Sequence, residues 1–240
     1  MSQLERSAPL PSSEPSLIRV TVDAAHCVSG LLLRPPESRA CLVLAHGAGA
    51  GMEHPVMREV ASELAARGIA TLRYQFPYME RGSRRPDPPP LCHATVRAAV
   101  AEAARLAPDL VLVAGGRSFG GRMTSQAQAE APLPGVRGLA FLGFPLHPAG
   151  RASDARAKHL FDVRVPMLFV QGTRDALADL DLLMPLVSRL GGLARLERIP
   201  DADHSFHVPA RTGRTNRDAM GEALTALDAF IAALATRAPP

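Results

Sequence analysis

The chain has 240 residues, 47% of them hydrophobic and 21% charged, which excludes a disordered or fibrous protein and favours one domain with a full core. It contains 8 Phe, 2 Tyr and no Trp, so Leu, Val, Ile and Ala must build the core, as in buried parallel strands and their covering helices. The formal net charge is +4, but the basic residues are scattered among 23 acidic ones, and we expect no nucleic-acid partner.

The first third of the chain begins with a polar, proline-containing stretch, and we expect residues 1–16 to be a flexible segment before a domain of residues 17–240. Apolar runs and alternation then predict a hairpin at 17–22 and 27–33 and a buried strand at 41–45. Helical spacing predicts a helix at 53–67, which Gly68 ends, and a strand follows at 69–73. Residues 75–90 are rich in Pro and charge and are predicted to form a loop.

The remaining elements continue this alternation of strand and helix. We predict helices at 91–107, 122–129, 177–190 and 215–233, a short helical patch at 154–160, and strands at 110–114, 138–143, 166–171 and 194–199. Repeated strand–helix–strand units require right-handed crossovers. The predicted fold class is therefore α/β, with a mostly parallel sheet of about eight strands and helices on both faces.

Cysteine usage and hydropathy indicate where the protein works. Cys27, Cys41 and Cys92 are odd in number and widely spaced, so neither a disulfide framework nor a zinc site is predicted. The N-terminus lacks the apolar run of a signal peptide, and no apolar stretch of about 18 residues is present to span a membrane. We therefore expect a cytoplasmic protein that does not bind membranes, uses no metal or organic cofactor, and has an oligomeric state that the sequence does not indicate.

The most informative motif is Gly116-Arg117-Ser118-Phe119-Gly120, a G-x-S-x-G pattern between an apolar strand and a helix. In that context the serine sits on a strained strand-to-helix turn, and the flanking glycines let the two elements approach closely. Ser118 is the predicted nucleophile. The backbone N–H of Phe119 is placed to stabilise an oxyanion.

A serine nucleophile needs a base and an orienting acid, which follow it in the order Ser, Asp or Glu, His in this arrangement. Asp175, just beyond the strand predicted at 166–171, is the expected acid, and His204, in the loop after the last predicted strand, is the expected base. Alternatives stay open at this point: Asp179 or Asp181 for the acid, and His207 for the base.

The glycine-rich loop of residues 46–51 directly follows the strand predicted at 41–45. We expect Gly47 or Ala48 to supply a second oxyanion N–H, and His46 to be a structural hydrogen-bonding residue rather than a metal ligand. A phosphate-binding loop is disfavoured because no GKS or GKT follows and no G-x-G-x-x-G is present.

Taken in order, HGAGAG, GGRSFGG, QGTRDAL and DADHSF make the sequence resemble the α/β-hydrolase superfamily from about residue 17 to residue 235. The segments HGAGAGMEHP, FPYMERGSRRPDP, GGRSFGGRM and GFPLHPAG resemble the dienelactone-hydrolase-like branch. That branch includes the testis-expressed hydrolase-like proteins and the third subunit of the non-specific-lethal chromatin complex. The resemblance implies Ser118, Asp175 and His204 as the triad. Dienelactone hydrolases carry cysteine as the nucleophile, so their substrate is not implied for a chain with Ser118.

Several segments could shape the substrate pocket. Only residues 145–165 separate two predicted strands where a cap domain is usually inserted, so we expect an open site without a cap. The candidate walls are Phe76 with Pro77 and Tyr78; Phe119; and Leu146, His147 and Pro148, although each could equally close the core. Arg117 and Arg122 flank the serine, and one of them could bind a substrate carboxylate, with an internal salt bridge as the more expected role.

These observations predict a serine hydrolase that cleaves carboxylic ester or thioester bonds of a small acyl substrate through an acyl-enzyme. Amide hydrolysis would use the same groups and stays open. The alternative from another class is a catalytically silent hydrolase fold that serves as a protein-interaction module. That alternative predicts a missing or displaced triad member, whereas all three residue types are present in the expected order.

Overall fold

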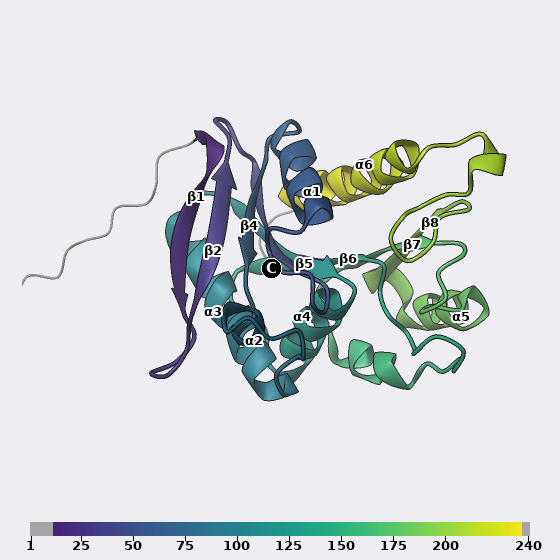
Figure 1. The fold of residues 1–240 in the computed structure, drawn as a ribbon, viewed down its shortest axis with the longest axis horizontal. Coiled ribbons are helices and arrows are strands. Elements are labelled where there is room, and N and C mark those ends of the chain that lie inside the picture. Colours follow the sequence, from purple (N-terminus) through teal and green to yellow (C-terminus); the bar gives the residue numbers. More distant parts are fainter. Residues whose placement is uncertain (1–11, 237–240) are drawn as a thin grey trace, which may run out of the picture.

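A computed structural model describes residues 12–236 of the chain. An eight-stranded sheet with strand order β1-β2-β4-β3-β5-β6-β7-β8 runs through the molecule, and β1 and β2 lie at one end of it (Figure 1). Strand β2 is antiparallel to both of its neighbours, β1 and β4, and the pairs from β4 through β8 are all parallel. The strands are β1 (Ser12–Thr21), β2 (Cys27–Arg34), β3 (Ala40–Ala45), β4 (Ile69–Tyr74), β5 (Val111–Arg117), β6 (Val136–Leu142), β7 (Met167–Gly172) and β8 (Ala194–Ile199).

Helices cover both faces of the sheet, and the central strands are buried from both sides. Along β3, Cys41, Val43 and Ala45 belong to one core cluster, while Leu42 and Leu44 belong to the other, as the two-residue period of a strand requires. Helices α1 (Pro55–Ala65) and α6 (Asn216–Ala235) cover one face, and the opposite face is covered by α3 (Pro89–Leu106), α4 (Phe119–Glu130) and α5 (Leu180–Leu190) (Figure 1). The predicted class, a single α/β domain with a mostly parallel sheet, is confirmed.

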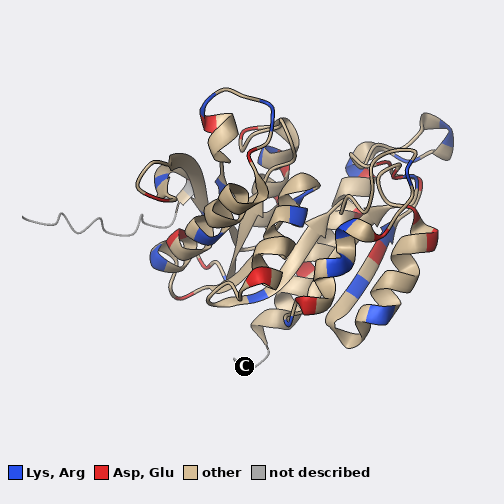
Figure 2. Ribbon diagram, turned by 90° about the horizontal axis from the view of Figure 1, so that it is seen from below, with Lys and Arg blue, Asp and Glu red and all other residues tan. Residues whose placement is uncertain are grey.

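The segment between β6 and β7 holds only the 3₁₀ helix η1 (Ala155–Asp162), so no cap domain is inserted there. The other 3₁₀ turns are η2 (Gly191–Leu193) and η3 (Ala210–Thr212). No helix in residues 12–236 is long and apolar enough to cross a bilayer. Basic and acidic residues are interspersed along the ribbon (Figure 2).

Several predicted boundaries need correction. Strand β1 begins at Ser12, so residues 12–16, assigned above to the flexible segment, include strand residues paired with β2; Ser12 lies opposite Arg34. This end of β1 is on the sheet edge and is largely polar, so apolar alternation did not mark it. The rest of that segment, residues 1–11, and the last residues of the predicted domain, 237–240, lie outside the described residues.

The proline-rich loop at 75–90 contains a one-turn helix, α2 (Pro77–Glu80), which is too short to show a hydrophobic period. Strand β5 continues through two glycines to Arg117 and α4 begins at Phe119, so the turn between them is Ser118 alone, not residues 115–121. Helix α5 begins at Leu180 because Asp179 caps it, its side chain accepting a hydrogen bond from the N–H of Asp181.

Candidate active site

The turn between β5 and α4 holds Ser118 in a rare backbone conformation, with φ 51° and ψ −117°. Its surroundings leave no space for side chains: a Cβ added to Gly115 would lie 1.9 Å from the carbonyl oxygen of Ala140, and one added to Gly120 would lie 2.5 Å from that of His46. A non-glycine residue at positive φ costs about 1–3 kcal/mol and persists where the surrounding packing imposes it. The glycines therefore let β5 and α4 close together and hold Ser118 at the carboxyl edge of the sheet.

Three side chains from distant parts of the chain form one hydrogen-bonded line. The imidazole Nε2 of His204 lies 2.8 Å from Ser118 Oγ, and its Nδ1 lies 2.6 Å from Asp175 Oδ2. They follow β5, β7 and β8, whose carboxyl ends meet at one edge of the sheet. With Nδ1 carrying the proton toward Asp175, Nε2 is free to accept the proton of Ser118. The structure thus brings together the three residues that the motifs indicated.

The Asp175 side chain is fully buried, and its two oxygens are held separately. Oδ1 accepts a hydrogen bond of 2.7 Å from the N–H of Leu177, and Oδ2 accepts one from the side-chain amide of Gln171. The Gln171 oxygen in turn accepts the N–H of Phe144 at 2.9 Å. A buried carboxylate needs such partners. Sequence reasoning assigned no role to Gln171; the only signal was its place at the end of a buried strand, where a polar side chain is unusual.

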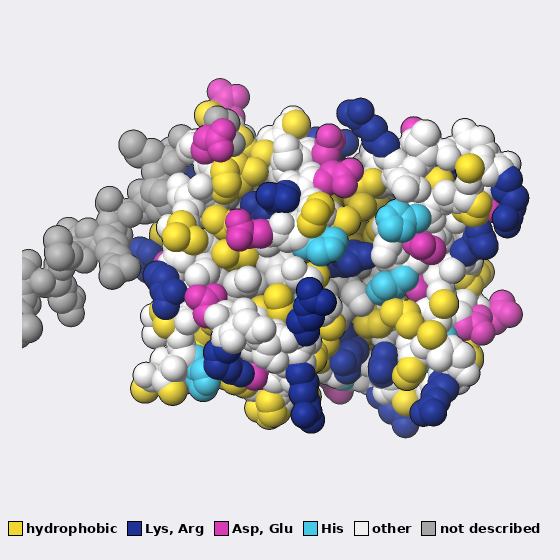
Figure 3. Space-filling view, viewed as in Figure 1, with side chains coloured by type: hydrophobic (Ala, Val, Ile, Leu, Met, Phe, Trp, Pro, Cys, Tyr) yellow, Lys and Arg dark blue, Asp and Glu magenta, His cyan; other side chains and the backbone are white. Residues whose placement is uncertain are grey.

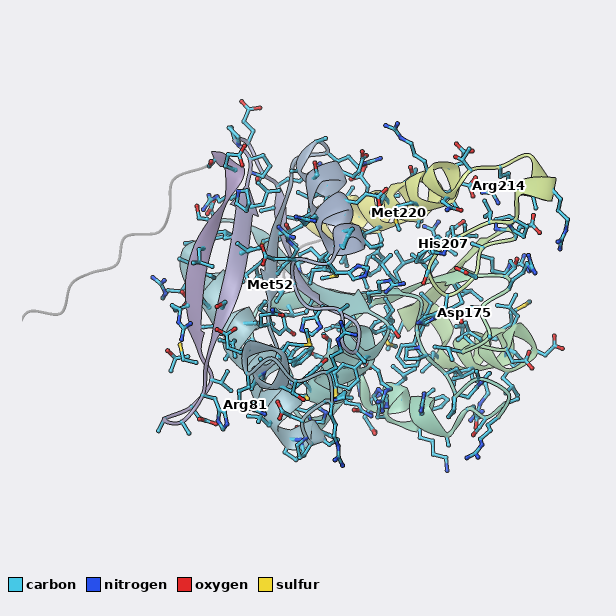
Figure 4. The ribbon with its side chains drawn as sticks, in the orientation of Figure 1. Met52, Arg81, Asp175, His207, Arg214 and Met220 are labelled. Carbon is cyan, nitrogen blue, oxygen red and sulfur yellow. The ribbon has the colours of Figure 1, made fainter. Side chains whose placement is uncertain are left out.

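The alternatives for acid and base lie elsewhere. Asp179 is exposed and caps α5, and Asp181 is exposed on the first turn of that helix. His207 has an exposed side chain whose Nδ1 lies 3.6 Å from Asp203 Oδ2. Asp175 and His207 are labelled in Figure 4, on the loops after β7 and β8. Histidine side chains gather in the middle of the face seen in Figure 3, with arginine beside them.

The backbone N–H groups expected to hold an oxyanion belong to Phe119 and to Gly47 or Ala48. Phe119 is the first residue of α4, where an N–H has no acceptor within its own helix. Gly47 is buried beside the nucleophile: a Cβ added to it would lie 3.8 Å from Ser118 Cβ. Ala48, the other candidate, is exposed. Of the two residues that the sequence left open, Gly47 is the better placed.

His46 fastens the loop that carries Gly47. Its side chain is fully buried; Nδ1 donates to the Gly47 carbonyl oxygen at 2.7 Å, and Nε2 accepts the N–H of Phe76 at 3.2 Å. These roles require the neutral ring, and burial lowers the pKa of His46 to about 4, against the opposing effect of the bond to Gly47. This matches the expected structural role. No group of three or more potential metal ligands occurs among residues 12–236.

The predicted pocket walls are less accessible than expected. Phe76 and Tyr78 have no exposed surface, and His147 is 4% exposed, with Nδ1 bonded to the Pro148 carbonyl and Nε2 accepting the N–H of Asp179. Their side chains therefore pack against the loops of the site. They are too buried for a substrate to touch them. Phe119 is half-buried and packs edge-on against Phe76 and Tyr78, so it alone of these rings offers surface.

Neither arginine beside Ser118 pairs with a carboxylate within the described part of the chain. Arg117 donates to Ser205 Oγ at 2.8 Å, and the guanidinium of Arg122 stands 5.8 Å from the centre of the Phe119 ring. The internal salt bridge expected for these residues is therefore wrong.

A groove of about 470 Å³ adjoins the loop that carries His204. It lies between α1 and α6, and His207 and Met220, both labelled in Figure 4, are among its lining residues, with Val56, Glu59 and Asn216. Ser118 is not part of its lining, so this groove is a neighbour of the triad and does not contain the nucleophile.

Known proteins share this architecture. A lid-less α/β serine hydrolase from Xanthomonas campestris superimposes with a TM-score of 0.71 and 21% identity, over 96% of this chain and all of that one. A dienelactone hydrolase from Anabaena variabilis gives 0.69 and 23%, over 90% and 94% of the two chains. Esterase 2 from Thermogutta terrifontis gives 0.69 and 18%, over the whole of both chains. At these identities the likeness concerns the fold.

A family model adds a match at the level of sequence. It describes an alpha/beta hydrolase domain and covers residues 38–232, which contain the whole candidate site. The chain belongs to the alpha/beta hydrolase domain family.

Proposed function

We propose that the protein is a serine hydrolase that cleaves carboxylic ester or thioester bonds of a small acyl substrate through an acyl-enzyme. The single observation that carries the proposal is the unbroken line of hydrogen bonds from Ser118 through His204 to Asp175, with distances of 2.8 and 2.6 Å. A fold used only as an interaction module has no need to keep this geometry, so the line argues against the silent alternative.

Each group has a defined part in the proposed reaction. Ser118 Oγ attacks the substrate carbonyl carbon while His204 Nε2 takes its proton, and the negative charge on the carbonyl oxygen is held by the N–H groups of Phe119 and Gly47. His204 then gives the proton to the leaving alcohol or thiol. Water, deprotonated by the same imidazole, releases the acid in the second half. Asp175 holds the imidazole in the tautomer that the steps require.

The open, cap-free edge of the sheet favours small or surface-presented acyl groups over lipid aggregates. Within the family we place the chain in the dienelactone-hydrolase-like branch with the testis-expressed hydrolase-like proteins, on the strength of HGAGAGMEHP, GGRSFGGRM and GFPLHPAG. The serine at position 118 separates its expected substrate from dienelactone. A cytoplasmic location and the absence of a nucleic-acid partner remain part of the same proposal.

The test is intact-mass analysis after exposure to a fluorophosphonate, which phosphylates activated serines. The Thermogutta esterase has been solved phosphorylated by paraoxon, a probe of the same chemical type. We expect one adduct on the wild type, none on Ser118→Ala, and one on Ser188→Ala, which changes an exposed serine on α5. A folded wild type without adduct would contradict the proposal and favour the interaction module; an adduct leads to a screen of ester chain lengths.

A further inference from the structure

Arg117 occupies the last position of β5, directly before the nucleophile. Strand alternation places it on the same face as Val113, which packs in the core under α1 and α6. From there its guanidinium Nη2 donates a 2.8 Å hydrogen bond to Ser205 Oγ, the residue directly after His204. One side chain thus joins the strand of the nucleophile to the loop of the base.

The same guanidinium lies beside the loop that carries the proposed oxyanion N–H. A Cβ added to Gly47 would be 3.7 Å from Arg117 Nη1. The backbone of Arg117 continues into Ser118, its side chain reaches Ser205, and its edge faces Gly47. The turn of Ser118, the loop of His204 and the loop of Gly47 therefore meet around one residue.

The charges around Arg117 do not explain its presence. Burial lowers the pKa of Arg117 more than the nearby carboxylates of Asp203 and Asp175 raise it. Burial and, after it, the Arg117 cation lower the pKa of His54, at the start of α1. The Nε of Arg117 is buried with no hydrogen-bond partner among the described residues. Burying an arginine with an unsatisfied N–H donor and no ion pair costs free energy, so filling space does not explain this residue.

The loop that carries His204 is bonded to the loop after β7, where the Arg174 N–H donates to the Ala202 carbonyl at 2.9 Å and the Asp201 N–H donates to Thr173 Oγ1 at 2.8 Å. It is also bonded within itself. Asp203 Oδ1 accepts the N–H groups of Ser205 and His207 at 2.7 and 2.9 Å, and the Asp203 N–H donates to the His207 carbonyl at 2.9 Å. Phe206 closes the turn with φ 61°, a left-handed value that is rare for a non-glycine residue. Among the bonds of this loop, the one from Arg117 joins it to β5, the strand that leads into Ser118.

We propose that Arg117 is a positioning residue of the triad, which holds Ser205 and thereby sets the approach of His204 to Ser118. The inference rests on the proposed hydrolase function and adds a residue to its machinery. Arg117 touches no reacting atom in this role. Its loss should therefore affect the rate of the chemical steps and leave substrate affinity nearly unchanged.

The experiment compares Arg117→Met, which keeps the length but removes the donors, with Ser205→Ala, which removes the acceptor. Misplacing a catalytic group by about 1 Å can cost about 100-fold, so we expect kcat to fall about 10- to 100-fold in either variant, with KM changed less than about 2-fold. The double variant should be no slower than the single ones, because both remove one bond. Arg117→Lys, which keeps a donor, should recover part of the rate. Arg151→Met, at an exposed arginine, is the matched control and should behave as wild type.

A second readout needs no turnover. The proton on His204 Nδ1, bonded to Asp175, should give a far-downfield NMR signal in the wild type and in Arg151→Met, and a broadened or lost signal in Arg117→Met and Ser205→Ala. An unchanged kcat in both variants, an unchanged signal, or a raised KM with normal kcat would overturn the inference. If Arg117→Met unfolds, Ser205→Ala decides. If the wild type forms no fluorophosphonate adduct, the proposed function fails, and the NMR signal still tests the tether.

Discussion

The turn of Ser118, the proposed nucleophile, and the loop of His204, the proposed base, meet at one edge of the sheet, but they follow strands that are buried to different extents. Ser118 follows β5, a central strand, and is confined by backbone packed against backbone: 1.9 Å separates the carbonyl of Ala140 from a Cβ added to Gly115. His204 follows β8, an edge strand whose residues are mostly half-buried or exposed. The start of its loop packs backbone against backbone, since a Cβ added to Gly172 would lie 2.3 Å from the Ala202 carbonyl oxygen, and side-chain bonds from Asp203 and Arg117 hold the part around His204.

This contrast predicts that substitutions near Ser118 and substitutions near His204 have different consequences. Disturbing the nucleophile turn means moving strands of the core, so the expected consequence is loss of the fold. Disturbing the half-buried residues around His204 means breaking side-chain bonds, so the expected consequence is a slower reaction with nearly normal stability.

The largest expected effect is that of Gly115→Ala. The added Cβ cannot be accommodated beside Ala140 without separating β5 from β6, so we expect destabilisation above the usual cost of overpacking, about 3 kcal/mol, or failure to fold. Urea unfolding followed by circular dichroism measures it. Gly221→Ala is the control: it is in α6 with nothing within 4 Å, and should stabilise by up to about 1 kcal/mol. Equal stability of Gly115→Ala and wild type would contradict the claim that backbone packing confines the turn at Ser118.

The next largest effect concerns the stability of the fold at acidic pH. His46 has a folded-state pKa lowered to about 4 from 6.5, so the unfolded chain binds a proton more readily between these values. The contribution of neutral His46 to the free energy of unfolding is complete above about pH 6.5. It is lost as pH falls toward 4, which lowers that free energy by about 3 kcal/mol. Urea unfolding at pH 7 and pH 4.5 tests this. The loss between the two pH values should be smaller in His46→Gln, which cannot titrate; an equal loss in both proteins would show that His46 is not the group responsible.

The smallest expected effect concerns the loop that carries His204. Asp203→Ala removes the acceptor for the N–H groups of Ser205 and His207, so the base loop should loosen and kcat should fall about 10-fold, with a change in unfolding free energy of about 1 kcal/mol. Initial rates with a short-chain ester and a thermal melt measure both quantities. His207→Gln, which changes an exposed side chain on the same loop, should keep full activity; a loss there comparable to that of Asp203→Ala would revive His207 as the base.

The motif-level predictions succeeded where the structural reason is local. A G-x-S-x-G between an apolar strand and a helix predicted the turn at Ser118, although it overestimated the length of that turn, because the glycines extend β5 and do not end it. The one-turn helix α2 was missed for a related reason: four residues are too few to display a period. Burial of Phe76 and Tyr78 had no local signal at all, since aromatic residues suit a pocket wall and a core equally.

By itself, the sequence determined the α/β class, the order of strands and helices, and the positions of Ser118, Asp175 and His204 along the chain, because hydrophobic period and glycine placement are properties of neighbouring residues. Only the tertiary structure decided that Gln171 holds the Asp175 carboxylate, that His46 fixes the loop of Gly47, and that Arg117 reaches Ser205. Contacts such as that between Arg117, at the end of β5, and Ser205, in the loop after β8, join distant segments, and no spacing along the chain encodes them. They exist because parallel strands bring their carboxyl ends to one edge.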